Sequence, residues 1–218
     1  IVGESGSGKS TIGRMILGLE DITEGSVIYR GKDLKLITDT NERRAHCLSM
    51  QCIFQDPYSS LNPRMTAGEN ITYGLRVHKM ISSGDAKSLA QELMALVGLP
   101  REDAEKLPHA FSGGERQRIG IARALSYRPD FIFCDEPTSA LDVSVQANLL
   151  NLLKDLQEKF SLTLLFVSHD LAVIRQMCDR VIVMKEGEAL ESDSNDNIFE
   201  HPKHQYTRSL LDAMPKFK

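Results

Sequence analysis

Residues Gly3-Glu4-Ser5-Gly6-Ser7-Gly8-Lys9-Ser10-Thr11 fit the pattern G-x-x-x-x-G-K-[ST] of a phosphate-binding loop. Its glycines let several backbone N–H groups point at one anion. The ammonium group of Lys9 supplies a full charge for the β- and γ-phosphates of a nucleotide, and the hydroxyl of Ser10 suits Mg²⁺. The apolar run from Ile12 to Leu19 predicts a helix that starts at the lysine, with its positive end beneath the phosphates.

The amino-acid composition is typical of a globular protein that forms a hydrophobic core. The 218 residues suit one large domain or a domain with a lobe, with 41% apolar and 26% charged residues. A net charge of −4 without a basic stripe argues against nucleic-acid binding. No apolar run approaches the roughly 18 residues of a membrane span, and no signal peptide is apparent. The chain starts inside a predicted strand, so we expect part of that strand to precede Ile1.

The cysteines are expected to be reduced structural thiols. The first two form a C-x4-C pair without matching metal ligands nearby, and the third lies in an apolar strand. The four positions are Cys47, Cys52, Cys134 and Cys178.

Strand and helix patterns alternate along most of the chain, which predicts a mainly parallel sheet with right-handed crossovers. Strands are expected at 27–29, 50–54, 131–134, 163–167 and 181–184, helices at 42–49, 86–97, 112–125, 143–160 and 171–177, and a turn at 31–33. Residues 66–107 show helical patterns and no strand signal, so this block is predicted to be an inserted helical lobe.

Two acids end a strand that should be buried on both faces. The apolar run Phe131–Cys134 is followed by Asp135 and Glu136. An α/β sheet holds its ligand at strand ends beside such a phosphate loop. Asp135 is therefore a candidate Mg²⁺ ligand, directly or through water, and Glu136 a candidate general base for the attacking water. Without the loop, the two acids would indicate only a strand end.

Three further positions suit the same chemistry. The glycines of Ser112-Gly113-Gly114 open a helix and predict a second anion-binding site, which is useful only if it serves the nucleotide of a second subunit; an ordinary loop is the alternative. His169 follows a buried strand, where it can hydrogen-bond a γ-phosphate and orient Glu136, or merely cap the next helix. Gln55 ends another strand and offers an uncharged donor and acceptor to Mg²⁺ and water.

Together these pieces resemble the ATPase subunit of ATP-binding cassette (ABC) transporters over nearly the whole chain. The matching segments are Walker A at Gly3–Thr11, the Q-loop at Gln55, the signature at Phe111–Glu115, Walker B at Phe131–Glu136, the D-loop at Ser139–Asp142 and the H-loop at His169. Their order and separations also fit. The signature commonly reads Leu-Ser-Gly-Gly-Gln, whereas here Phe111 and Glu115 flank the shared core, and Glu115 brings a negative charge near the nucleotide.

The resemblance implies an α/β fold of the P-loop NTPase (RecA-like) class, with a mainly parallel sheet core and an inserted helical subdomain. The predicted segments are residues 1–63 and 126–192 for the two parts of the catalytic core, 64–125 for the helical subdomain with the signature, and 193–218 for a C-terminal importer-type extension. The implied cofactors are ATP and Mg²⁺. The implied catalytic residues are Lys9, Gln55, Glu136 and His169; the ATP-binding residues are Gly3–Thr11, Ser112–Gly114 and Asp142; and the metal ligands are Ser10, Gln55 and Asp135.

The tail narrows the resemblance. Residues Asn197–Leu211 resemble the C-terminal extension of the oligopeptide, dipeptide and nickel importer subgroup, with Gln205 where that subgroup often has proline. Residues Gln55–Pro63 also look like that subgroup. His201 and His204 lack acidic or thiol partners, so we do not expect them to bind a metal.

The implied function is ATP hydrolysis that powers uptake, by subgroup analogy of peptides. The expected partners are a second ATPase subunit, identical or not, transmembrane permease subunits and, indirectly, an extracytoplasmic substrate-binding protein. The subunit would lie peripherally on the cytoplasmic face of the cell (inner) membrane. Two subunits would bind two ATP head to tail, each between the P-loop of one chain and the signature helix of the other. The aromatic residue that stacks on adenine in this family is expected before Ile1.

Two alternatives remain from the sequence. One is a soluble ABC protein of translation or DNA repair, although such proteins usually carry two cassettes in one chain or a long coiled-coil insert, and neither is visible here. The other is a non-catalytic nucleotide-sensing module, which the presence of both Glu136 and His169 disfavours.

Overall fold

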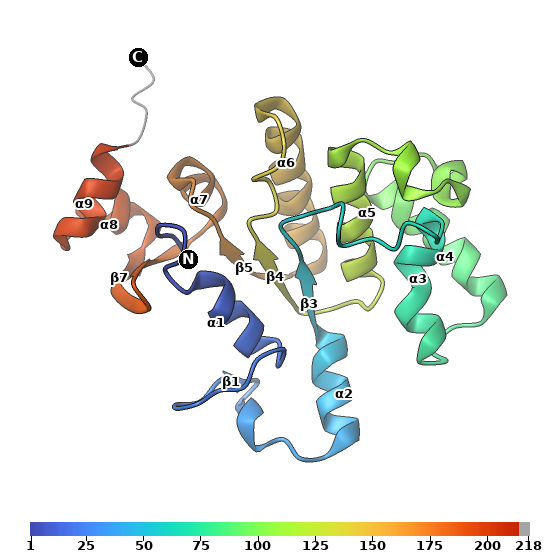
Figure 1. Ribbon diagram of the computed structural model, residues 1–218, viewed down its shortest axis with the longest axis horizontal. Coiled ribbons are helices and arrows are strands. Elements are labelled where there is room, and N and C mark those ends of the chain that lie inside the picture. The colour runs from blue at the N-terminus through green and yellow to red at the C-terminus, as the bar shows by residue number, and fades with distance from the viewer. Residues whose placement is uncertain (214–218) are drawn as a thin grey trace. The chain divides into compact units, whose positions relative to one another are not determined.

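The computed structural model describes residues 1–213, and the chain divides into two compact units (Figure 1). The first unit joins Ile1–Leu36 to the segment from Leu165 onward, and the second is Ile37–Leu164. Residues 214–218 of the predicted extension lie outside the described residues. Within residues 1–213, no helix is both long and apolar enough to cross a bilayer.

In the first unit, the opening residues of the chain pair with strands that come much later. The backbone N–H of Val2 donates to the carbonyl of Ile182 at 2.9 Å, and the carbonyl of Val2 accepts from Met184 N–H at 2.8 Å. Val2 also forms a parallel bridge to Ser168. The elements of this unit are α1 (Lys9–Ile16), β1 (Ile28–Tyr29), β2 (Lys32–Asp33), η1 (Leu34–Leu36), α7 (Leu171–Met177), β6 (Arg180–Lys185), β7 (Glu188–Ser194), α8 (Asn195–Glu200) and α9 (Gln205–Asp212). The opening residues thus pair with β6 through Val2 immediately before the chain enters the phosphate loop.

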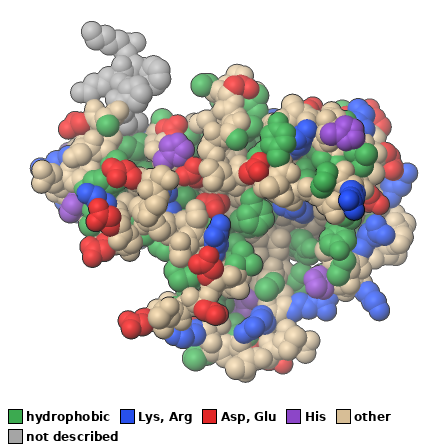
Figure 2. Space-filling view, in the orientation of Figure 1, with side chains coloured by type: hydrophobic (Ala, Val, Ile, Leu, Met, Phe, Trp, Pro, Cys, Tyr) green, Lys and Arg blue, Asp and Glu red, His purple; other side chains and the backbone are tan. Residues whose placement is uncertain are grey.

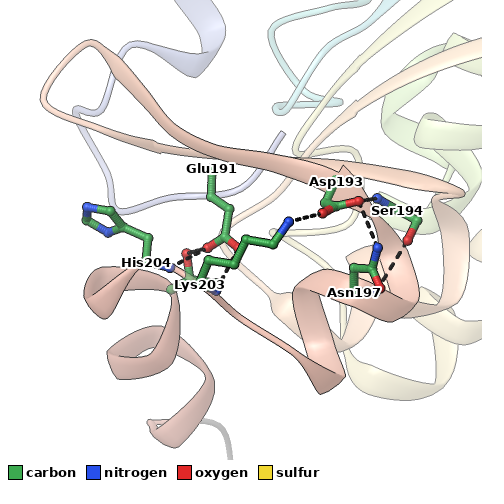
Figure 3. A network of polar contacts seen from close by, with 7 residues as sticks. Glu191, Asp193, Ser194, Asn197, Lys203 and His204 are labelled. Atoms are coloured by element: carbon green, nitrogen blue, oxygen red, sulfur yellow. Dashed lines mark hydrogen bonds and ion pairs between the residues drawn. The ribbon is translucent and has the colours of Figure 1, made fainter.

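Two carboxylates on β7 hold the segment that leads into α9 (Figure 3). Glu191 accepts hydrogen bonds from the backbone N–H groups of Lys203 and His204, at 2.8 and 3.0 Å, and from the Thr207 hydroxyl at 2.6 Å. Asp193 accepts from the Asn197 amide at 2.9 Å and the Lys203 ammonium at 2.7 Å, which lowers the pKa of the Asp193 carboxyl. The start of α9 is therefore fixed against β7.

The second unit is a sheet with helices around it. Its elements are α2 (Thr40–Ser49), β3 (Met50–Ile53), α3 (Ala67–Val77), α4 (Ser83–Leu96), η2 (Arg101–Glu105), η3 (Pro108–Ala110), α5 (Gly113–Leu125), β4 (Phe131–Asp135) and α6 (Val143–Phe160). Strand β5 (Thr163–Val167) begins here, and the sheet order is β3-β4-β5. Strands β3 and β4 run parallel, with Ile53 opposite Cys134. Ile132 and Phe133 are almost fully buried, which confirms the predicted buried strand.

Helices α3, α4 and α5 lie together in one group (Figure 1). Ile71, Met94 and Ile119 fill the space between them, each at most 1% exposed. Helix α4 ends at Leu96, and Gly98 adopts the left-handed conformation (φ 75°) that glycine commonly takes just after a helix end. Every element between residues 66 and 107 is helical, as predicted for this stretch. The four predicted domain boundaries stay a prediction.

The structure corrects the predicted turn at 31–33. The turn is Arg30-Gly31, with both residues at positive φ (51° and 76°), and Lys32 and Asp33 form β2, paired antiparallel with β1. This is the two-residue hairpin geometry that matches the twist of the flanking strands.

Two other details also differ from the predictions. Strand β7 was not predicted, because its sequence is polar and carries no alternation of apolar residues. On α6, the apolar spacing predicts that Val145, Leu149, Leu152, Leu153 and Leu156 face inward, whereas Leu150 is also buried.

Candidate active site

The phosphate loop is shaped by close packing against β6 and the turn that follows it. A side chain at Gly3 would place its Cβ 2.1 Å from the carbonyl oxygen of Met184, so only glycine fits there. Gly8, at φ 93°, is the N-cap of α1, and no side chain caps this helix. The N–H of Gly187 donates to the Ser7 carbonyl at 3.1 Å and closes the loop. The loop is therefore braced by the β6–β7 hairpin.

Lys9 folds its side chain back over this loop. Its ammonium donates to the carbonyls of Gly3 and Glu4, at 2.9 and 2.7 Å, and to the hydroxyl of Ser7 at 3.2 Å. The residue is only 5% exposed. These three oxygens belong to neutral groups, and together they fix the position of the ammonium. A fixed, buried cation of this kind is suited to bind a phosphate group.

In the second unit, two predicted catalytic side chains meet at the ends of neighbouring strands. The amide of Gln55 lies 3.4 Å from a carboxylate oxygen of Glu136. Glu136 follows β4 and has a left-handed backbone (φ 45°), which costs a residue with a side chain about 1–3 kcal/mol. Its carbonyl accepts from the N–H and hydroxyl of Ser139, at 3.2 and 3.1 Å, which offsets part of that cost. The turn directs the Glu136 carboxylate toward Gln55.

The start of α5 is closed by a capping box. The hydroxyl of Ser112 accepts from the Glu115 N–H at 3.4 Å, and the Glu115 carboxylate accepts from the Ser112 N–H at 2.8 Å. The same carboxylate oxygen accepts from the Ser112 hydroxyl, also at 2.8 Å. The hydrogen bond from the Ser112 N–H, and next that from its hydroxyl, lower the pKa of Glu115. Ser112-Gly113-Gly114 thus opens a helix, as predicted.

The sequence profile of the family described as "ABC transporter" matches residues 1–139. The chain belongs to the ABC transporter family. Two similar relatives are a Brucella ovis protein, provisionally named a peptide import ATP-binding protein, and the oligopeptide transport ATP-binding protein OppF of Bacillus subtilis. The first is 49% identical over 99% of this chain and 68% of its own length, and the second 48% over 99% and 71%.

A solved structure is similar along most of the chain. It is the dimeric, post-hydrolysis state of the ATP-binding cassette MJ0796 bound to ADP and Pi, with a TM-score of 0.77 and 33% identity, covering 89% of this chain and 83% of that one. The predicted P-loop NTPase fold and the predicted family are confirmed. As a member of the ABC family, this chain binds and hydrolyses ATP.

The residues described above fit a nucleotide with Mg²⁺. The phosphate loop presents a buried ammonium and a helix start without a side-chain cap. Within residues 1–213, no cluster of three or more His, Cys, Asp or Glu side chains could hold a metal ion by itself. Mg²⁺ needs no such cage, because it is usually held by one or two protein oxygens, waters and substrate phosphates. Ser10, Gln55 and Asp135 offer oxygen ligands of the right kind.

The remaining predicted residues are distributed over both units. His169 is exposed, and Asp170, rather than His169, caps α7 by accepting from Ala172 N–H at 2.8 Å. The alternative that His169 is merely a cap is therefore wrong. Asp142 caps α6 and accepts from Val145 N–H at 3.0 Å, a bond that lowers the pKa of Asp142.

One contact that sequence reasoning missed links the segment after Gln55 to α5. The guanidinium of Arg116 lies 4.2 Å from the centre of the Tyr58 ring. The buried side chain of Gln117 donates to the Phe54 carbonyl at 3.0 Å. The only hint in the sequence was the pair Arg116-Gln117 directly after the signature. It could not indicate these contacts, because the partners Tyr58 and Phe54 lie about 60 positions earlier in the chain.

A second missed contact joins the tail to the phosphate loop. The hydroxyl of Tyr206 on α9 accepts from the N–H of Glu4 at 3.4 Å, and the ammonium of Lys185 lies 5.0 Å from the centre of its ring. The sequence of Asn197–Leu211 indicated a resemblance to the importer subgroup. Nothing in that sequence indicated a contact with the phosphate loop.

Proposed function

We propose that this chain is the ATP-hydrolysing subunit of a peptide import system, and that it works as one of a pair of cassettes beside permease subunits. The observation that carries the hydrolytic part is the contact between Gln55 and Glu136 at 3.4 Å, since a general base needs a partner that orients it toward water. The names of the relatives, oligopeptide transport and peptide import ATP-binding proteins, support the substrate class.

The proposed roles follow from the chemistry of each group. Lys9 and the backbone of Gly3–Thr11 bind the β- and γ-phosphates. Ser10, Gln55 and Asp135 hold Mg²⁺, which when bound neutralises phosphate charge and orients the transferred group. Glu136 takes a proton from the attacking water, and His169 hydrogen-bonds the γ-phosphate.

The second cassette is proposed to complete each nucleotide site. Ser112, Gly113 and Gly114 contact the nucleotide bound to the partner, and Asp142 lies beside it. The dimeric state of the similar cassette MJ0796 with ADP and Pi supports this arrangement. Because ATP binds the closed pair better than the open one, ATP binding shifts the population toward closure, and hydrolysis with product release reverses the shift.

Exposed apolar side chains in the second unit support a permease partner. Tyr58 is 63% exposed, and Tyr73 and Val77 on α3 are each 55% exposed. Tyr73 and Val77 are one helical turn apart and therefore share a face. We place this surface at the cytoplasmic face of the membrane, with the substrate-binding protein reached only through the permease.

A nucleic-acid partner is not proposed. On the face shown in Figure 2, acidic and basic side chains are interspersed over the surface. The formal net charge of the chain is −4, whereas phosphate backbones are bound by clustered lysines and arginines.

Growth on peptides tests the proposal. A host strain that lacks the gene and needs one amino acid is supplied with that residue only as an oligopeptide. The wild-type gene should restore growth and uptake of labelled peptide, whereas Glu136→Gln, expressed at the same level, should restore neither. Normal peptide uptake in the deletion strain, with a defect in translation or DNA repair, would favour a soluble ABC protein instead.

A further inference from the structure

The signature serine is already engaged by its own helix. A hydroxyl group has a single proton to donate. In this structure the Ser112 hydroxyl donates that proton to the Glu115 carboxylate at 2.8 Å. While this bond lasts, Ser112 offers only lone pairs to any other group. A phosphate oxygen is itself an acceptor, so it gains nothing from a serine in this state.

The identity of residue 115 determines how strongly the serine is held. An ionised carboxylate can only accept hydrogen bonds, so Glu115 can engage the Ser112 hydroxyl only as a donor. A glutamine in the same place can also donate its amide N–H to the serine oxygen, which leaves the hydroxyl proton available. Hydrogen bonds to a charged acceptor are also roughly twice as strong as neutral ones.

We propose that Glu115 competes with ATP for the Ser112 hydroxyl, so that two cassettes close only when this internal pair opens. The inference rests on the proposed function, in which Ser112 contacts the nucleotide of the partner subunit. Glu115 is thus a positioning residue: it acts on the nucleotide through Ser112 and sets how readily the pair of cassettes closes.

The chain contains a matched control. Helix α3 starts with a second capping box, in which Glu69 accepts from the Thr66 N–H at 2.8 Å and donates its own N–H to the Thr66 hydroxyl at 3.1 Å. Neither residue belongs to the proposed ATP site. Replacing Glu69 by glutamine therefore makes the same change in charge and cap without touching a nucleotide contact.

The test compares Glu115→Gln and Glu69→Gln, each combined with Glu136→Gln so that bound ATP persists. Dimer dissociation constants are measured by sedimentation at saturating ATP and Mg²⁺, and circular dichroism verifies folding. Since each dimer contains two Ser112–Glu115 pairs, Glu115→Gln should tighten the dimer about 5- to 25-fold. Glu69→Gln should leave the dissociation constant within about twofold of the parent.

A third comparison separates the hydrogen bond from simple charge repulsion. In a Ser112→Ala background there is no hydroxyl to release, so Glu115→Gln should tighten the dimer by less than about twofold. A gain that persists in this background would overturn the proposal, because it would assign the effect to charge alone. An unchanged or weakened Glu115→Gln dimer would also overturn it. If the Glu136→Gln parent fails to dimerise with ATP, two identical copies do not form the pair, and this inference, which is drawn for such a pair, is overturned. The proposed function is tested separately by peptide uptake and allows a second cassette of different sequence.

Discussion

The starts of α1 and α5 both contain glycine, Gly8 at the N-cap of α1 and Gly113-Gly114 in the first turn of α5, yet they are built differently. Helix α1 begins after Gly8 and has no side-chain cap, whereas α5 begins with a complete Ser112–Glu115 capping box. Around α1, Lys9 is held in place by neutral oxygens. At the start of α5, the Glu115 carboxylate accepts a hydrogen bond from the Ser112 hydroxyl. The first helix start has no side-chain cap, whereas the second carries an internal bond between Ser112 and Glu115.

The largest effect is expected on the turnover number of Glu136→Gln, a variant that keeps ATP bound while the two helix starts are compared. Glu136→Gln should reduce the turnover number about 10²- to 10⁴-fold while ATP binding is retained, because the proposed general base is lost and the phosphate loop is untouched. Phosphate release and nucleotide binding are measured on the same preparation. Turnover within tenfold of wild type would remove Glu136 from the proposed role.

Lys9→Ala tests the helix start that has no cap. The variant should bind ATP roughly 100-fold more weakly, because charge-assisted contacts with the phosphates are lost. A fluorescent nucleotide titration measures the dissociation constant. Lys35→Ala removes a lysine that donates to the Thr23 carbonyl at an exposed position, and this variant should bind ATP like wild type. Equal affinity in both variants would contradict the assignment of Lys9.

Ser112→Arg tests the capped helix start. A large side chain there should weaken ATP-driven dimerisation at least about tenfold by overpacking the proposed interface. ATP binding by the monomer should be unchanged, because Ser112 serves the nucleotide of the other subunit. Light scattering with and without ATP gives the oligomeric state, and undiminished dimerisation would exclude the shared site.

The smallest effect is expected at the control helix. Thr66→Ala removes the cap of α3 and should destabilise the fold by about 1 kcal/mol. The melting temperature should fall by roughly 2–4 °C, with unchanged affinity for ATP. A change in nucleotide affinity without a change in melting temperature would mean that the two capping boxes are not comparable.

Local signals determined which elements the sequence could predict. Helices α5, α6 and α7 were predicted well because each begins directly after a capping residue, Ser112, Asp142 or Asp170, and runs through an apolar pattern. Strand β7 carries no such signal, because its polar residues Glu191 and Asp193 make their contacts with the later segment 203–207.

In the candidate site, too, local motifs could be predicted from the sequence, whereas contacts between distant residues could not. The phosphate loop and Glu136 follow from motifs, since glycine, lysine and glutamate occur there at fixed spacing. The contact between Tyr206 and Glu4 joins residues about 200 positions apart. The left-handed backbone at Glu136 could not be predicted from the sequence either, because the hydrogen bonds from Ser139 that offset its cost form only in the folded turn.

The pairing of Val2 with β6 has a consequence for synthesis of the protein. The partners that brace the phosphate loop, Ile182, Met184 and Gly187, are translated about 180 residues after the loop itself. At ordinary elongation rates the ribosome needs roughly 10–35 s to reach them. A nascent chain therefore carries its Walker A residues without these backbone partners until residues 182–187 have been synthesised.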